Sequence, residues 1–340
     1  MGLSLLPIIS LGEIKHLDNE HLLQNKVIFV IIGVAAAISM MLIDYRRLEK
    51  YGWMFYGIGV LILLMTSSFA NGMIVGQLIF EIGSVRIKSI MALPFLFLAW
   101  APFFNNSKLN IWQLGGLFLF PLYLFLRTPN IPVAFSYTVI VFVMLWWSKI
   151  GRKKVIFITV GYACLALIGS SLSWSLLHEY QKERILGFLN PEEYANDAGF
   201  LYLRLKELTS SVGWLGTFVK QNSIPVAHTD FVFASLTNYY GYLFAIVLVA
   251  ILALFIVRMV VISYKIIDDF GKLLVVGGIA LYAVPFVYNI SMTLGLLPIA
   301  GVSLPFISYG LMPTVMNAFI MGVVLSVYRR KDLVLCSKNA

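Results

Sequence analysis

The chain has 340 residues, of which 60% are hydrophobic and only 12% are charged. Ordinary soluble domains carry about 25% charged residues, so this composition excludes a soluble globular domain and predicts an integral membrane protein. The formal net charge of +9 does not require a nucleic-acid partner, because basic residues collect in the cytoplasmic loops of membrane proteins.

The first apolar stretch, at residues 1–12, is too short to span a bilayer on its own. It lacks the basic start and the small-residue cleavage pattern of a signal peptide, so we interpret it as a half-length first span. Nine longer apolar runs follow, and we interpret each as a span of the roughly 30 Å hydrocarbon layer. They cover residues 26–43, 52–70, 89–104, 110–126, 131–147, 154–176, 234–257, 272–292 and 304–327.

These runs are continuously apolar and lack the short alternating pattern of an outer-membrane barrel. The sequence therefore predicts an all-α fold, a polytopic transmembrane helical bundle with about nine or ten spans in a single domain over residues 1–340. Residues 177–229 form a large outer loop before the third-last span. The two cysteines, Cys164 and Cys336, are too far apart in this topology to predict a disulfide.

Charge clusters alternate with the spans and predict the orientation. Basic clusters fall on one side, at residues 44–50, 148–154, 258–272 and 329–332. By the positive-inside rule this side, with the C-terminus, is the cytoplasm. The other side receives residues 13–25, 71–88, 177–229 and 293–303 and all four histidines, His16, His21, His178 and His228. The basic residues of the long loop do not oppose this orientation, because long loops cross regardless of charge.

Three stretches stand out from generic membrane sequence. They are "LHEYQKERILGFLNPEE" (177–193), "IPVAHTDFVFAS" (224–235) and "LGLLPIAGVSLPFISYG" (294–310). The glycines and prolines of the last stretch distort any helix, and distorted backbone at membrane depth is tolerated only against protein or a wet cavity. We therefore expect Pro298, Gly301 and Pro305 to line a cavity that faces Asp230 and not the lipid.

Together these stretches resemble the SEDS family, the FtsW, RodA and SpoVE proteins, over roughly residues 26–332. The family pattern Y-Q-x-x-R-[IV] with a following [DN]-P is present as Tyr180, Gln181, Arg184, Ile185, Asn190 and Pro191. Its P-E-x-H-T-D-F pattern is present as residues 225–231, and its G-x-x-L-P-[FL]-[IV]-S-Y-G-G pattern begins at Gly301. Lys206 and Asn289 match a basic position of the outer loop and a polar position of the penultimate span.

The resemblance implies a peptidoglycan glycosyltransferase that polymerises lipid II at the outer face of the bacterial cytoplasmic membrane, with a class B penicillin-binding protein as partner. It makes Asp230 the essential acidic residue, the general base that activates the acceptor sugar hydroxyl. Candidate substrate-binding residues are Arg184, Lys206, His228, Thr229, Ser308, Tyr309 and Asn289. The histidines show no metal-ligand spacing, so no metal ligands are predicted, and a divalent-cation cofactor is left open.

The chemistry of the reaction fits these residue types. A glycan grows when a sugar hydroxyl displaces a lipid diphosphate, so the acceptor needs a base and the leaving group needs positive charge. Asp230 at the lipid boundary is partly desolvated, which makes it a better proton acceptor. Arg184, Arg204 and Lys206 supply cations that suit a diphosphate. The structural alternative is that Asp230 caps the span at 234–257, because aspartate is favoured at helix N-caps.

Several positions depart from the family pattern, and most of the departures remove carboxylates. The family glutamate is Val226, an acidic pair is replaced by Asn238 and Tyr239, and Q-P-D is replaced by residues 128–130. The P-S-E pattern is absent around residues 88–91, and Leu311 replaces the second glycine after S-Y-G. A non-catalytic scaffold that binds lipid-linked precursor or a penicillin-binding protein therefore stays open. A precursor transporter is a third hypothesis, which the absence of an internal repeat disfavours.

The predicted orientation is testable with single cysteines in a chain whose native cysteines are replaced by serine. We expect Ser210→Cys to react with a membrane-impermeant maleimide added from outside. Ser148→Cys should react only after the membrane is permeabilised, because the basic cluster at 148–154 stays in the cytoplasm. The opposite labelling pattern would contradict the orientation.

Overall fold

A computed structural model describes residues 19–74, 77–82, 85–105, 109–128, 131–172, 179–216 and 229–331. The predicted half-span at residues 1–12 and the candidate His228 lie outside these residues. The helices are α2 (Asn19–Leu42), α3 (Gly52–Ser68), α4 (Leu93–Asn105), α5 (Ile111–Arg127), α6 (Ile131–Trp146), α7 (Arg152–Leu172), α8 (Glu179–Leu189), α9 (Phe200–Ser210), α10 (Val232–Ser263), α11 (Asp269–Thr293) and α12 (Leu311–Arg329). Short 3₁₀ helices, η2 (Tyr45–Tyr51) and η3 (Ser89–Ala92), precede α3 and α4.

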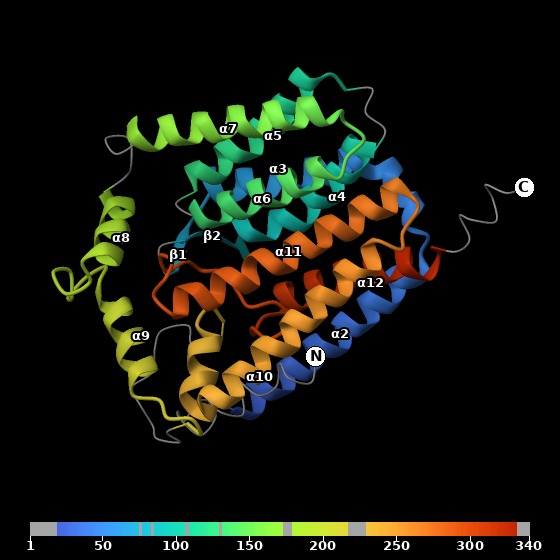
Figure 1. The fold of residues 1–340 in the computed structure, drawn as a ribbon. Helices are drawn as coiled ribbons and strands as arrows, with labels where there is room; N and C mark the ends of the chain where they lie inside the picture. Colours follow the sequence, from blue (N-terminus) through green and yellow to red (C-terminus); the bar gives the residue numbers. More distant parts are fainter. Residues whose placement is uncertain are drawn as a thin grey trace, which may run out of the picture.

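The predicted polytopic helical bundle is confirmed, and the protein is an integral membrane protein. Five described helical stretches are long and apolar enough to cross a membrane, at Gln24–Leu42, Tyr45–Ser68, Val232–Ser263, Asp269–Thr293 and Leu311–Arg329. The apolar helices α4, α5 and α6 are shorter. The described part of the predicted outer loop, residues 179–216, contains α8 and α9, which form an arm along one side of the bundle between α7 and α10 (Figure 1).

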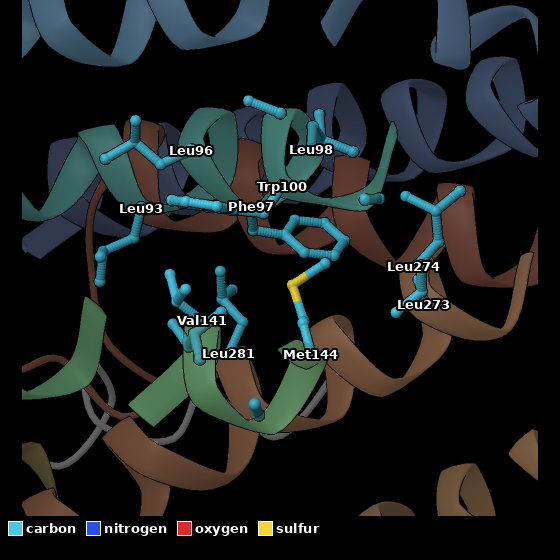
Figure 2. Close-up of a cluster of buried hydrophobic side chains, with 14 of the residues drawn as sticks. Leu93, Leu96, Phe97, Leu98, Trp100, Val141, Met144, Leu273, Leu274 and Leu281 are labelled. Atoms are coloured by element: carbon cyan, nitrogen blue, oxygen red, sulfur yellow. The ribbon is translucent and has the colours of Figure 1, made fainter. Parts of the chain in front are cut away.

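Helix α11 forms the centre of the bundle and contacts α4, α6, α10 and α12 (Figure 1). Its contact with α4 and α6 is a large apolar cluster (Figure 2). The cluster includes Leu93, Leu96, Phe97, Leu98 and Trp100 from α4, Val141 and Met144 from α6, and Leu273, Leu274 and Leu281 from α11. Close approach is possible because α11 has a glycine here. A Cβ atom on Gly277 would lie 2.6 Å from the Phe97 ring and 2.8 Å from the Met144 sulfur.

Helices α2 and α12 run parallel and contact each other along their length (Figure 1). Near their starts, Lys26 donates to the Ser308 carbonyl. At their ends, the Arg330 guanidinium donates to the carbonyls of Met41 and Leu42. The last carbonyls of a helix have no partner within the helix, so Arg330 caps α2 from the neighbouring chain segment. A basic side chain thus donates to backbone carbonyls at each end of the α2–α12 pair.

Helix α10 is broken at Gly241, where the backbone has φ 87° and ψ 175°. The end of the outer loop enters this break. The backbone N–H of Leu243 donates to the carbonyl of Trp214 at 3.1 Å, and a Cβ on Gly216 would lie 2.2 Å from the Tyr239 carbonyl oxygen. Only glycine, which has no side chain, fits at positions 216 and 241. The loop therefore supplies hydrogen-bond acceptors that the broken helix lacks.

The prediction that one span covers residues 304–327 is wrong at its start, because α12 begins only at Leu311. Residues 301–310 are not helical, and Phe306 has a positive φ of 64°. A positive φ strains any residue other than glycine, so Phe306 needs close packing to keep this conformation. The Phe306 ring supplies that packing, since it contacts the rings of Tyr282 and Phe255 at centroid distances of 4.9 and 5.5 Å.

A three-stranded antiparallel sheet, absent from the predicted fold, occupies the outer segment between α3 and α4. Its strands are β1 (Gly72–Ile74), β2 (Gln77–Ile82) and β3 (Val85–Lys88), in the order β1-β2-β3. Directly opposite residues Glu81 and Arg86 form an ion pair at 2.9 Å, and Ile79 faces Lys88. Cross-strand pairs of this kind set the register. The register of the sheet therefore fixes the position of Lys88 at the end of β3.

The α11 contact predicts the effect of a single methyl group. We expect Gly277→Ala to destabilise the protein by about 1–3 kcal/mol, because the new Cβ overpacks the Phe97 and Met144 side chains. Gly57→Ala is the matched control, since a Cβ there meets nothing within 4 Å. Thermal unfolding in detergent measures both variants. Equal melting temperatures for the two variants would contradict the close contact.

Candidate functional site

Asp230 lies at the turn that leads into α10, and only 1% of its surface is exposed. Its carboxylate faces two side chains from distant parts of the chain. The Lys88 ammonium, at the end of β3, lies 3.9 Å from Oδ2, and the Ser303 hydroxyl lies 3.5 Å from Oδ1. The Lys88 side chain is 21% exposed and the Asp230 side chain 2%. A buried carboxylate thus has its charge balanced by a lysine that is partly open to the outside.

The alternative role of Asp230 as the helix cap is not what the structure shows. Helix α10 starts at Val232, its N-cap residue is Phe231, and no side-chain capping bond is made there. The Asp230 side chain faces Lys88 and Ser303 instead. The residue lies two positions before the helix, one position too early for a cap.

The backbone on either side of Asp230 is held by two buried polar side chains. The Asn289 amide of α11 donates to the carbonyls of Asp230 at 2.8 Å and Val302 at 2.6 Å. The Ser308 hydroxyl donates to the Thr229 carbonyl at 2.6 Å and accepts the N–H of Leu304 at 2.8 Å. Asn289 is fully buried, and its Oδ1 atom has no hydrogen-bond partner among the residues that the structure describes. Asp230 is therefore fixed through its own backbone.

The segment 299–308 lies beside Asp230, with Ser303 near its carboxylate and Ser308 bonded to Thr229, while the cavity lined by Pro298, Gly301 and Pro305 stays a prediction. Two tyrosines hold its start, because Tyr202 of α9 accepts the Ile299 N–H at 2.9 Å and Tyr288 of α11 donates to the Pro298 carbonyl at 2.9 Å. A buried apolar cluster joins α9, α10 and α11 to this segment. The cluster comprises Tyr202, Leu205, Leu208, Phe231, Ala234, Tyr288, Met292, Ile299, Ala300 and Val302. The irregular backbone is thus packed against protein, which is the condition for its stability at membrane depth.

The predicted site residues divide into two groups. Thr229, Asp230, Asn289 and Ser308 meet in one place, and Asn289 and Ser308 hold backbone there. Tyr309 follows Ser308 and turns to α2, where its ring lies 5.7 Å from that of Phe29. Lys206 lies on the exposed face of α9, 73% exposed, with its ammonium 4.0 Å from the Glu192 carboxylate. Arg184 lies on α8, and its side chain, like His228, is outside the described residues.

Three residues of the site were missed from sequence. Lys88, Ser303 and Lys26 were not named as candidates, although Ser303 belongs to the stretch 294–310 that stood out in the sequence. A lone charge at the start of an apolar run is a functional signal in membrane proteins, and Lys26 fits that description. Lys88 stands directly before the apolar run at residues 89–104, so it carried a comparable signal. Within the described ranges, no group of three His, Cys, Asp or Glu side chains is placed to hold a metal ion.

This arrangement places a buried carboxylate next to a partly exposed cation. The distance from Lys88 to Asp230 is that of an ion pair and exceeds hydrogen-bonding distance. A carboxylate beside a cation is chemistry suited to proton transfer coupled to departure of an anion.

Known proteins resemble the chain over nearly its whole length. The family profile of FtsW, RodA and SpoVE, described as "Cell cycle protein", matches residues 1–333. Peptidoglycan glycosyltransferase MrdB of Escherichia coli K12 is 28% identical over 333 residues, which cover 92% of this chain and 87% of that protein.

Two solved structures share the fold. A chain in a structure reported as "Structural coordination of polymerization and crosslinking by a peptidoglycan synthase complex" superposes with a TM-score of 0.79 at 23% identity, covering 97% of this chain and 95% of that one. Rod shape determining protein RodA of Thermus thermophilus gives a TM-score of 0.69 at 20% identity, covering 97% and 94%. With a family profile matched from residue 1 to residue 333, the chain belongs to the FtsW/RodA/SpoVE family.

Proposed function

We propose that this protein is a peptidoglycan glycosyltransferase that polymerises lipid II at the outer face of the bacterial cytoplasmic membrane. The observation that carries the proposal is the buried Asp230 carboxylate, held by its backbone and facing Lys88. The name of the MrdB relative, peptidoglycan glycosyltransferase, supports the same activity. The orientation deduced from the basic clusters puts Asp230 on the outer side, where the lipid-linked sugar is presented.

Asp230 is the general base in this proposal. The acceptor sugar hydroxyl gives its proton to the carboxylate while its oxygen attacks the anomeric carbon of the donor sugar. The bond from that carbon to the diphosphate oxygen breaks, and the lipid diphosphate leaves with the electron pair. A general base must be in a fixed position to help in such a step. Asn289 and Ser308 provide this by holding the carbonyls of Asp230 and Thr229.

In this proposal Lys88 acts on both negative charges of the reaction, the Asp230 carboxylate and the departing diphosphate. Before reaction, its ammonium balances the Asp230 carboxylate. When Asp230 takes the proton it becomes neutral, and Lys88 loses its counter-ion. The positive charge is then available to the departing diphosphate, whose charge develops in the same step. Because the Lys88 side chain is partly exposed and Asp230 is not, the acceptor approaches beside Lys88.

The partner in this proposal is a class B penicillin-binding protein, which would crosslink the strands made here. Support comes from the solved structure with a TM-score of 0.79, which is reported as a complex that coordinates polymerization and crosslinking. The outer arm of α8 and α9 and the C-terminus in the cytoplasm complete the proposed topology.

The base is tested by Asp230→Asn, which keeps size and shape but removes the proton-accepting carboxylate. We expect synthesis of glycan strands from lipid II to fall by roughly two to four decades, the usual contribution of general base catalysis. Asp197→Asn, at an exposed aspartate of the same outer loop, is the matched control and should retain activity. Both variants are purified with the candidate partner and compared at equal protein levels.

A fully active Asp230→Asn variant would contradict the role of base. If wild-type protein makes no glycan with any penicillin-binding protein, and the Asn variant still supports growth in cells, the protein is a scaffold and the proposed activity is wrong.

The role of Lys88 predicts that Lys88→Met lowers the rate by roughly one to two decades, because both the carboxylate and the leaving group lose a positioned cation. Residues that act as a unit are non-additive, so the loss in the double variant, Lys88→Met with Asp230→Asn, should be smaller than the product of the two separate losses. Lys153→Met, at an exposed lysine of α7, is the control. Additive losses in the double variant would show that Lys88 acts elsewhere.

A further inference from the structure

Lys26 is a fully buried lysine in the apolar helix α2. It contacts the carbonyl of Ser308, whereas the hydroxyl of Ser308 contacts Thr229, the residue before Asp230. Its ammonium donates to the Ser308 carbonyl at 2.8 Å and lies 3.5 Å from the Thr314 hydroxyl. The Tyr309 ring centroid is 5.8 Å away. Among the residues that the structure describes, no carboxylate lies within ion-pair distance of this ammonium. Lys26 is thus a buried cation with neutral partners.

A buried ammonium without a counter-ion is costly, and ionisable residues within membrane spans are rare unless they serve a function. The partners of Lys26 indicate what it does. Thr314 donates its hydroxyl hydrogen to the Gly310 carbonyl at 2.7 Å, so its oxygen is left to accept from Lys26. The Ser308 carbonyl receives a charge-assisted hydrogen bond, which is stronger than a neutral one. Lys26 therefore fixes both ends of residues 308–314.

Ser308 transmits this position to the site. Its carbonyl is held by Lys26, while its hydroxyl donates to the Thr229 carbonyl at 2.6 Å. Thr229 directly precedes Asp230. Strain in the same segment, from the positive φ of Phe306, gives the backbone a tendency to relax if one hold is lost. Two hydrogen bonds and one peptide unit therefore link the ammonium in α2 to the residue that carries the carboxylate.

We propose that Lys26 is a positioning residue for Asp230, acting through Ser308. The catalytic part of this inference rests on the proposed glycosyltransferase function. Lys26 does not touch the substrate. It holds the irregular segment 301–310 in the conformation in which Ser308 reaches Thr229, and thereby keeps the Asp230 carboxylate aligned with the acceptor.

The first experiment compares the kinetics of glycan synthesis. Lys26→Met removes the charge and the donor while retaining a long unbranched side chain. We expect it to lower kcat by roughly one to two decades with KM near the wild-type value, because misalignment slows the chemical step without removing a substrate contact. Lys26→Arg keeps charge and donors and should recover part of kcat. Lys50→Met, an exposed lysine in η2, is the matched control and should behave as wild type.

The second experiment does not depend on activity. Amide hydrogen exchange in detergent should become faster at residues 301–310 in Lys26→Met, while α11 keeps its wild-type protection. A purely structural role would instead speed exchange throughout α2, α11 and α12 and lower the melting temperature in proportion to the loss of activity.

The outcomes separate the two proposals. Wild-type kcat together with wild-type exchange in Lys26→Met overturns the positioning role while the glycosyltransferase stands. A loss of activity with uniform loosening of the bundle, and no recovery in Lys26→Arg, also overturns it. Inactive wild-type protein defeats the proposed function, and the exchange at residues 301–310 then decides whether Lys26 positions this segment.

Discussion

A backbone that leaves helical geometry at membrane depth must find its hydrogen-bond partners inside the protein, because lipid offers none. Residues 299–310 meet this constraint with polar side chains from three helices and from the segment itself. Tyr202 comes from α9, Asn289 from α11 and Lys26 from α2, and Ser308 belongs to the segment. Asp230 lies where these bonds converge. The geometry of the candidate site follows from the hydrogen bonds that satisfy the backbone of this irregular segment.

The rigidity of the site comes from the apolar packing beneath it. Helix α11 presents Asn289 from a position fixed by the tight contact of Gly277 with α4 and α6. The Phe306 ring holds the strained segment against α10 and α11. On the other side, the small sheet fixes where Lys88 ends β3. A carboxylate and its cation are thus carried by separate rigid supports, which is how proteins maintain a precise catalytic distance.

The sequence predicted the parts of this fold that depend on local residue patterns. The bilayer imposes length and apolarity on a span, so helices such as α5 and α6 lie close to the predicted residues. Hydropathy treats Leu304, Pro305 and Phe306 as membrane-buried and cannot detect a positive φ, so the start of α12 was misplaced. The sheet was missed because its short strands are stabilised by pairing such as Glu81 with Arg86. Lys88 and Lys26 were missed as site residues because their partners lie far along the chain, and a single sequence carries no record of such contacts.

The parallel pairing of α2 with α12 has a consequence for how the protein is made. Among the described residues, Lys26 finds its acceptors in residues 308 and 314. Arg330 caps the end of α2, and the Ser326 hydroxyl donates to the carbonyl of Ile43, which follows. A ribosome has synthesised almost the whole chain before these groups exist. Until then α2 resides in the membrane with a lysine that reaches toward the interface and with uncapped carbonyls at its other end. Closure of the bundle is therefore a late event of biogenesis, and the Ser308 end of the site takes its final form only when the last helix has entered the membrane.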